Sequence, residues 1–323
     1  MPRAISVTVP ATSANLGPGF DCLGLALNIY LRVSCSAEGR GLRISANEPG
    51  IALDQTNLIY RAMAAAVEAA RQPEPDGIAL RIENAIPLSR GLGSSAAAIA
   101  AGLMLGNALA GEPFDKARLL EIGLPLEGHP DNLAPALFGG LRVSSTAGSA
   151  GAPGGAGVAV EVGAAATAVA VGPQRVISLP VALGQAPDIV LYVPDFEMST
   201  HEARRVLPDS VPRVDAIFNA CRSSLLVAAL AGGDFSVLQW AMEDRLHQPY
   251  RSAIFPALPR LIQAALDAGA AGAALSGAGS TVIAFCERNS GSVAMAFEAA
   301  GRQAGLTGRS LTAEVDLEGA RLA

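Results

Sequence analysis

The sequence predicts a mixed α+β protein built from two domains. The chain has 323 residues, more than one average domain, and half of them are hydrophobic while only 16% are charged. That composition is typical of compact globular proteins. Strand and helix patterns follow one another without regular βα alternation, which favours an α+β sandwich over a parallel wound sheet. We expect an N-terminal domain over residues 1–163 and a C-terminal domain over residues 164–323.

The N-terminal domain is expected to begin with a strand and a loop. Residues 5–9 alternate with period two, and Pro10 is expected to end that strand. Small, polar and turn-forming residues fill 10–21, after which the apolar run 22–33 resumes extended structure. The remaining elements predicted here are strands at 42–46 and 78–86 and helices at 57–71, 94–110 and 114–123.

A low-complexity segment separates the two parts of the chain. Residues 147–157 (AGSAGAPGGAG) contain only Gly, Ala, Ser and Pro, so we expect a flexible surface loop near the domain junction. The elements predicted beyond it are strands at 158–162, 168–171, 188–193, 276–285 and 311–315, and helices at 213–231, 235–246, 257–268 and between the last two strands.

Charge and hydropathy exclude several classes of protein. The net charge is −6 and no block of consecutive Lys or Arg occurs, so no nucleic-acid partner is expected. The longest apolar stretch, 96–110, is too short for a membrane span and predicts a buried helix. The four cysteines form no CxxC pair and the N-terminus carries no secretory signal. We therefore expect a cytoplasmic protein without a membrane partner.

The strongest functional motif runs from a predicted strand, through a glycine turn, into a helix. Such a helix N-terminus offers unpaired N–H groups and a positive dipole end, and glycines allow a phosphate to approach. A plainer alternative is that Ser94 or Ser95 is only an N-cap. The predicted phosphate-binding residues are Pro87, Leu88, Ser89, Arg90, Gly91, Leu92, Gly93, Ser94, Ser95, Ala96 and Ala97.

Two other phosphate motifs do not account for this loop. The P-loop pattern requires a Lys, and none lies in or near the loop. Residues 91–96 do match the dinucleotide fingerprint G-x-G-x-x-A, with Glu112 near the expected acidic position. That fingerprint should be followed by a second strand, whereas the pattern at 114–122 predicts a helix.

Three motifs together resemble the GHMP kinase superfamily of small-molecule kinases. They are the phosphate loop at 87–97, the segment VPATSANLGPGFD at 9–21 and the segment ALSGAGSTV at 274–282, and they occur in the family's order and spacing. The resemblance implies a two-domain GHMP kinase fold, with a ribosomal-protein-like N-terminal domain and a ferredoxin-like C-terminal domain. It also implies ATP as co-substrate and Mg²⁺ as metal.

Further segments resemble the homoserine kinase branch of that superfamily. They are EGHPDNLAP at 127–135, LFGG at 137–140, STHEARRVLP at 199–208 and LHQPYR at 246–251. The resemblance implies L-homoserine as substrate. An α-carboxylate suits the planar donors of Arg204 and Arg251, and an α-ammonium suits the carboxylates of Asp21 and Asp131. His129 belongs to the same substrate-binding set.

The resemblance also implies roles in phosphoryl transfer. Ser95 and Glu127 would hold Mg²⁺. Glu121 is the rival acid, because it stands ten residues before Asp131 and gapped and ungapped comparisons with the family choose differently. Three residues are candidates for orienting the acceptor hydroxyl. They are Asn15, Asn132 and Thr200. Asp131 is the nearest candidate for a base, but a loose transition state needs little deprotonation of the nucleophile, so the base stays unassigned.

Plainer explanations and other functions stay open at this stage. Asn15 and Asp21 could be turn residues, His129 a loop histidine and Arg204 part of a solvated helix face. Relatives acting on isoprenoid precursors or sugars share the phosphate loop, and a non-catalytic nucleotide-binding regulator would share it too. The 147–157 segment and Ser280, where Pro is common, depart from the family pattern. A homodimer is compatible with the sequence, which does not specify oligomeric state.

Overall fold

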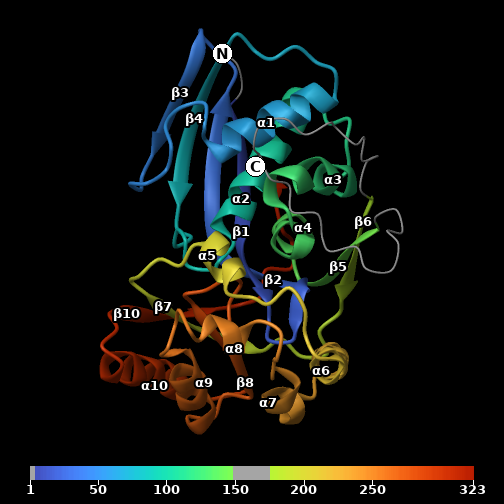
Figure 1. The fold of residues 1–323 in the computed structure, drawn as a ribbon. Coiled ribbons are helices and arrows are strands. Elements are labelled where there is room, and N and C mark those ends of the chain that lie inside the picture. The colour runs from blue at the N-terminus through green and yellow to red at the C-terminus, as the bar shows by residue number, and fades with distance from the viewer. Residues whose placement is uncertain (1–3, 148–174) are drawn as a thin grey trace.

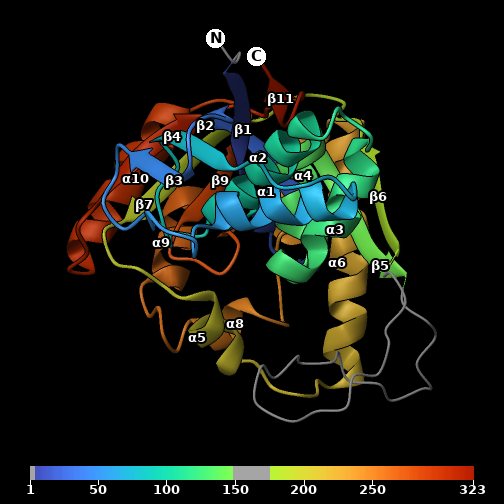
Figure 2. The same ribbon diagram turned by 90° about the horizontal axis from the view of Figure 1, so that it is seen from above.

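The computed structural model describes residues 4–147 and 175–323. The predicted loop beyond Ala147, the predicted strands at 158–162 and 168–171, and the boundary between residues 163 and 164 lie outside the described residues. The division into 1–163 and 164–323 therefore stays a prediction. The described chain forms two sheets with helices packed on them (Figures 1 and 2).

The first sheet has seven strands. Its main path is β11-β1-β2-β4-β3, and β5 extends it by pairing with β2 and with β6. All neighbouring strands are antiparallel except β3 and β4, which are parallel and are joined by a helix. The strands are β1 (Ile5–Asn15), β2 (Gly19–Ser36), β3 (Gly41–Ala46), β4 (Gly77–Asn84), β5 (Leu141–Ala147), β6 (Arg175–Val181) and β11 (Arg321–Leu322).

The sequence predicted that the first strand ends at Pro10, and this prediction was wrong. β1 continues to Asn15, and only Leu16, Gly17 and Pro18 separate it from β2. The register against β2 shifts between Pro10 and Ala11. A proline lacks an N–H for the ladder and is tolerated at such an irregularity. The polar motif at 9–21 is therefore mostly strand, with a tight turn at its end.

Four helices pack with the first sheet, and Figures 1 and 2 show them grouped beside its strands. They are α1 (Leu58–Ala69), α2 (Ser94–Leu109), α3 (Lys116–Glu127) and α4 (Pro130–Phe138). α2 is buried over most of its length, as its apolar composition predicted. Gly102 and Gly106 let its backbone approach α1 closely, because an added Cβ would lie 2.1 Å from the Ile59 carbonyl oxygen and 2.4 Å from that of Met63.

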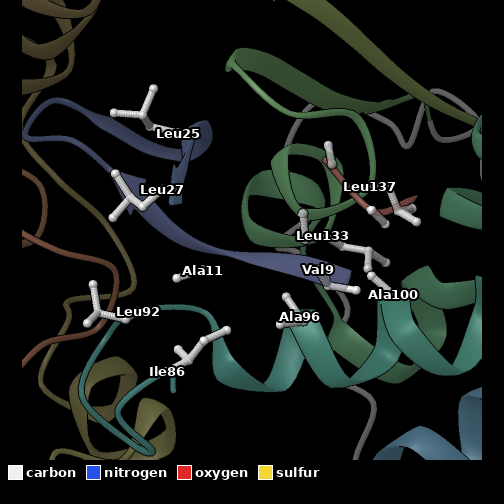
Figure 3. Packing of buried hydrophobic residues seen from close by; sticks show 14 of the residues in the cluster. Val9, Ala11, Leu25, Leu27, Ile86, Leu92, Ala96, Ala100, Leu133 and Leu137 are labelled. Atoms are coloured by element: carbon white, nitrogen blue, oxygen red, sulfur yellow. The ribbon is translucent and has the colours of Figure 1, made fainter. Parts of the chain in front are cut away.

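The central core forms where β1, β2 and the helices α2 and α4 meet. Figure 3 shows Val9 of β1 beside Ala96 and Ala100 of α2, with Leu133 of α4 close by and Ala11 farther along β1. All five side chains are fully buried. Small residues on α2 bring its first turn, and with it the phosphate loop, close to β1.

The second sheet has the ferredoxin-like topology that the family resemblance implied. Its order is β10-β7-β9-β8 with every neighbouring pair antiparallel. Apolar side chains of α9 and α10 form its core with β7 and β9. The elements are β7 (Asp188–Pro194), α5 (Thr200–Arg205), α6 (Arg213–Gly232), a 3₁₀ turn (Phe235–Val237), α7 (Leu238–Ala241), α8 (Gln248–Arg251), α9 (Leu258–Asp267), β8 (Gly272–Leu275), β9 (Val282–Cys286), α10 (Ser290–Gln303) and β10 (Gly308–Ala313).

Several predicted elements need correction. The helix expected at 235–246 is one 3₁₀ turn and the short α7, and the strand expected at 276–285 is instead a loop followed by β9. Seven elements are missing from the strands and helices that the sequence analysis predicted: α4, α5, α8, β5, β6, β8 and β11. These are short or, in α4, interrupted by proline, so local periodicity is weak in each.

One helix among the described residues, α6, is long and apolar enough to cross a bilayer by length and composition alone. Core helices of globular proteins pass the same test. α6 carries Asp215 and Arg222, which pair with Arg245 at 3.0 Å and Glu243 at 2.8 Å. These ion pairs tie one side of α6 to the segment that leads into α8.

Candidate active site

The phosphate loop joins β4 to α2, and its geometry excludes a serine cap. Gly93, with φ 65°, is the N-cap of α2, and no side chain caps the first turn. Ser94 and Ser95 are therefore the first residues of the helix. The N–H groups of this turn have no side-chain cap to satisfy them, which is the arrangement that binds anions.

Glycine is required in this loop by packing as well as by access for a ligand. A Cβ on Gly91, whose φ is +74°, would lie 2.2 Å from the Ser276 carbonyl oxygen. One on Gly93 would lie 1.9 Å from Thr12 Oγ1. Both positions combine a left-handed backbone with a close neighbour, so no other residue fits without movement.

Hydrogen bonds from both sheets hold the loop in place. Thr12 N of β1 donates to the Leu92 carbonyl oxygen at 3.1 Å, and Thr281 N donates to that of Arg90 at 3.1 Å. The Ser276 hydroxyl donates to the Gly91 carbonyl oxygen at 2.7 Å. The loop is thus a bridge between the two halves of the molecule.

The Arg90 side chain strengthens this bridge. Its Nε donates to the Pro194 carbonyl oxygen at 2.8 Å, and its Nη2 donates to that of Asp195. Its Nη1 lies 3.4 Å from Glu197 Oε1. The guanidinium therefore fixes the loop to the segment between β7 and α5, and Arg90 is also one of the residues that line the cavity.

The two predicted metal ligands contact one another. Ser95 Oγ donates to Glu127 Oε2 at 2.9 Å. Glu121, the rival acid, instead pairs with Arg118 on its own helix at 2.8 Å. Burial raises the pKa of Glu127 to about 8; the bond from Ser95 opposes this shift and the charge of Asp131 adds to it.

This pair is suited to a metal that the nucleotide helps to bind. The described residues contain no group of three or more His, Cys, Asp and Glu side chains placed to hold a metal. Mg²⁺ commonly takes one or two protein oxygens and completes its shell with phosphates and water. A hydroxyl and a carboxylate beside an anion-binding helix terminus fit that donor set.

Asp21 and Arg204 form the centre of the predicted acceptor side. Arg204 Nη2 lies 2.7 Å from Asp21 Oδ1, and its Nη1 lies 3.3 Å from Oδ2. His129 Nδ1 lies 3.7 Å from the same carboxylate. Burial lowers the pKa of His129. The residues predicted to bind an ammonium and a carboxylate therefore pair with one another in this structure.

The Asn15 side chain makes two hydrogen bonds to the protein that the sequence did not predict. Its Oδ1 accepts from Asp21 N at 3.0 Å, and its Nδ2 donates to the Gly277 carbonyl oxygen at 2.8 Å. Both polar groups of this side chain have protein partners, so it holds Asp21 in place. Asn132 Oδ1 accepts from Thr12 Oγ1 at 2.9 Å. Thr200 is the first residue of α5.

Asp131 is held inside the protein on the first turn of α4 and is 4% exposed. Burial raises its pKa to about 7, and the negative charge of Asp21 adds to that shift while Arg204 opposes it. Pro130 occupies the first helical position, which favours a helix start here.

One cavity of about 300 Å³ brings both sides together. The phosphate loop forms one part of its wall, and the predicted acceptor residues form another. Of the predicted site residues, only Pro87, Leu88, Ala96 and Ala97 do not line it. Its lining is Asn15, Asp21, residues 89–95, Glu127, His129, Asp131, Asn132, Met198, Ser199, Thr200, Arg204, Arg251 and residues 277–279.

Comparisons with known proteins agree with this geometry. The model for the N-terminal domain of GHMP kinases matches residues 57–140, and that for the GHMP kinase C-terminal region matches 226–303. The chain is 39% identical to a homoserine kinase of Microchaete diplosiphon over 98% of its own length and 96% of the relative's. It is 45% identical to one of a Synechococcus strain over 87% and 85%. The chain belongs to the homoserine kinase family.

A solved homoserine kinase from Cytophaga hutchinsonii shares the fold over the whole length. Its TM-score is 0.81 at 25% identity, covering 99% of this chain and 97% of that one. The family models cover residues from both sides of the cavity, with Glu127 and Asp131 in the first range and Arg251 in the second. Asp21 and Arg204 lie outside both ranges, so their place in the site rests on geometry and on the homoserine kinase motifs.

The sequence analysis missed part of the wall and a neighbouring cavity. Met198 and residues 277–279 line the site but were not among the predicted site residues. A second cavity of about 330 Å³ shares Ser89, Ser94 and Ser95 with the phosphate loop. Its other lining residues are Leu31, residues 50–52, residues 56–59, Ile82, Asn84, Leu88 and Ala98. Apolar residues in the loop before α1 are the only sequence signal for it, and that signal is weak.

Proposed function

We propose that this protein transfers the γ-phosphoryl group of ATP to the side-chain hydroxyl of L-homoserine, giving O-phospho-L-homoserine and ADP. The observation that carries the proposal is the shared cavity, in which an anion-binding helix terminus lies beside an acid and two arginines. A zwitterionic acceptor needs charges of both signs, whereas a neutral polyol needs neither. Membership of the homoserine kinase family supports the same acceptor.

The nucleotide is proposed to occupy the phosphate loop and the second cavity. The uncapped first turn of α2 would bind the phosphates through backbone N–H groups. The adjoining cavity, with Leu31, Ile51 and Ile82 in its wall, would take the base or sugar. This assignment adds nucleoside contacts for which the sequence offered no motif.

Ser95 and Glu127 are proposed to hold Mg²⁺ against the phosphates. The metal would neutralise charge on the transferring group. Because the pKa of Glu127 is raised to about 8, a cation beside it would favour the ionised carboxylate and displace its proton. The hydrogen bond between the two side chains already places both oxygens at one point of the cavity wall.

The acceptor is proposed to be bound by charge and oriented by polar side chains. Arg204 and Arg251 would bind its carboxylate, and Asp21 and Asp131 its ammonium, with His129 beside them. Asn132 and Thr200 would orient the hydroxyl, and Asn15 would act by holding Asp21. No dedicated base is assigned, because a loose transition state requires little early deprotonation.

We also propose a cytoplasmic location, because the four cysteines are free thiols and the reaction needs ATP.

The test of the function is Mg²⁺-dependent ADP release from ATP with L-homoserine, in parallel with L-serine, L-threonine, mevalonate and galactose. Homoserine-selective turnover with O-phosphohomoserine as product supports the proposal. Turnover with mevalonate or galactose instead would refute the acceptor assignment, and nucleotide binding without turnover would indicate a regulator.

A further inference from the structure

A buried group of three side chains lies at the acceptor side of the cavity, and only its arginine has a role in the proposed reaction so far. It consists of Asp244, His247 and Arg251, all at or just before the short helix α8. His247 is completely buried, and Arg251 is 1% exposed although it lines the cavity. A buried arginine needs protein acceptors, and the identity of these acceptors decides where its guanidinium points.

Protein acceptors hold one side of the Arg251 guanidinium. Its Nε donates to the Ala203 carbonyl oxygen at 3.2 Å. Its Nη1 donates to His247 Nδ1 at 3.1 Å and to the Gly277 carbonyl oxygen at 2.9 Å. Within the described chain no hydrogen bond to a protein acceptor involves Nη2. That nitrogen is left for an anion in the cavity.

These contacts fix the tautomer of His247. An arginine only donates hydrogen bonds, so His247 Nδ1 must accept and must carry no proton. The proton is therefore on Nε2, which lies 2.6 Å from the Gly17 carbonyl oxygen. Burial lowers the pKa of His247 to about 4, which keeps the ring neutral at neutral pH.

The charged groups around the ring agree with this assignment. Asp244 Oδ2 lies 3.5 Å from His247 Nε2, but it already accepts from the backbone N–H groups of His247 and Gln248 at 3.0 and 2.6 Å. The other oxygen accepts from Asn219 Nδ2 at 2.8 Å. Asp244 therefore orders the start of α8, and the Gly17 carbonyl is the nearer acceptor for the ring proton.

The second hydrogen bond of the His247 ring, to the Gly17 carbonyl oxygen, reaches the turn just before Asp21. Gly17 lies between β1 and β2, four residues before Asp21. Phe20, the second residue of β2, stacks on the His247 ring with centroids 5.3 Å apart. The guanidinium carbons of Arg204 and Arg251 lie 5.6 and 5.4 Å from the centroid of the Phe20 ring. His247 thus packs on the same Phe20 ring that both arginines contact.

We propose that His247 is a positioning residue for recognition of the acceptor carboxylate. Its unprotonated Nδ1 orients Arg251, and its Nε2 proton ties the Asp21 turn to α8. Selectivity for an acceptor with an α-carboxylate therefore depends on a side chain that does not itself touch the acceptor. This inference rests on the proposed homoserine kinase function.

Two substitutions separate the two hydrogen bonds of His247. The amide of His247→Asn can replace Nδ1 as the acceptor for Arg251, whereas that of His247→Gln reaches the Nε2 position and leaves Arg251 without this acceptor. The readout is the ratio of kcat/KM for L-homoserine to that for L-homoserine amide, which lacks the carboxylate charge. The KM for ATP is measured alongside, and His201→Gln, an exposed histidine on α5, is the matched control.

We expect His247→Gln to lower this ratio roughly 10-fold, the size expected for one hydrogen bond to a charged group. The KM for ATP should stay within about twofold, which marks the change as one of acceptor binding. His247→Asn should recover most of the ratio, and His201→Gln should not change it. An unchanged ratio in His247→Gln, or equal losses in both His247 variants, would overturn the proposal.

Separate controls distinguish a variant that fails to fold from a failure of the proposed function. Thermal melting checks each variant, because His247 is fully buried. If neither variant folds, Phe20→Leu removes the ring that stacks on His247 and lies beside both guanidinium groups. A several-fold loss of the same ratio is then expected, and an unchanged ratio overturns the proposal. If the wild-type protein does not phosphorylate homoserine at all, the proposed function itself fails, a result distinct from unchanged selectivity in an active enzyme.

Discussion

The two sides of the cavity are built in different ways. The phosphate loop is one continuous segment, in which backbone N–H groups and glycines form the proposed site and the Arg90 side chain anchors the loop to the end of β7. The acceptor side is made of charged side chains from the β1–β2 turn, α4, α5 and α8. A site made of backbone groups can be recognised from a short sequence motif. A site made of side chains from several elements depends on how distant segments pack.

The largest effect is expected from a single methyl group on the nucleotide side. Gly91→Ala places a Cβ against the Ser276 carbonyl at a positive φ, and displacing the loop by about 1 Å should lower kcat/KM for ATP at least roughly 100-fold. Gly111→Ala is the control, since Gly111 has φ +84° but open space around its Cβ position. Steady-state kinetics with melting curves distinguish the two; equal activity in both variants would contradict the backbone-built site.

On the acceptor side, Arg204→Ala should raise the KM for homoserine and leave the KM for ATP nearly unchanged. Loss of a charged hydrogen bond of about 2 kcal/mol corresponds to roughly a 30-fold increase. Arg205→Ala, the exposed neighbour on α5, should behave like the wild type. A change confined to kcat, or equal effects of the two substitutions, would place Arg204 outside the acceptor site.

A smaller effect is expected from one hydroxyl on the nucleotide side. Ser95→Ala removes the donor to Glu127 and one proposed oxygen ligand, so turnover at fixed ATP should fall roughly 10-fold and require more Mg²⁺ for half-maximal rate. Titration of the rate with Mg²⁺ at saturating homoserine measures this. An unchanged Mg²⁺ dependence would separate Ser95 from the metal.

The smallest effect concerns stability and has a defined pH dependence. Because the folded-state pKa of Glu127 is raised to about 8, the folded metal-free protein keeps a proton that the unfolded chain releases. Below the pKa that Glu127 has in the unfolded chain, this carboxyl therefore does not lower the free energy of unfolding. The destabilisation grows as the pH rises from there to about 8. Glu127→Gln should inactivate the enzyme yet raise its Tm in EDTA by a few degrees at pH 8, and not at pH 4.5 or below. An equal Tm difference at both values would contradict the raised pKa.

Much of the fold could be predicted because its helices and strands carry strong local patterns. The prediction for α1 was close, with Asn57 as its N-cap, and the burial of α2 followed from its Ala- and Gly-rich composition. Proline misled the prediction at Pro10, which lies at a register shift within β1. The tertiary structure tolerates there a residue that a local rule treats as a breaker.

By itself, the sequence determined the glycine-rich loop and the order of the main elements, and it predicted the charged residues proposed for the acceptor, because each follows from a local pattern. Only the tertiary structure decided which of these residues act together. It placed Glu127, rather than Glu121, against Ser95. It turned both polar groups of Asn15 to protein partners and put His247 behind Arg251. The Ser95–Glu127 and Asn15–Gly277 contacts join residues 32 and 262 positions apart, and no local spacing in the chain specifies them.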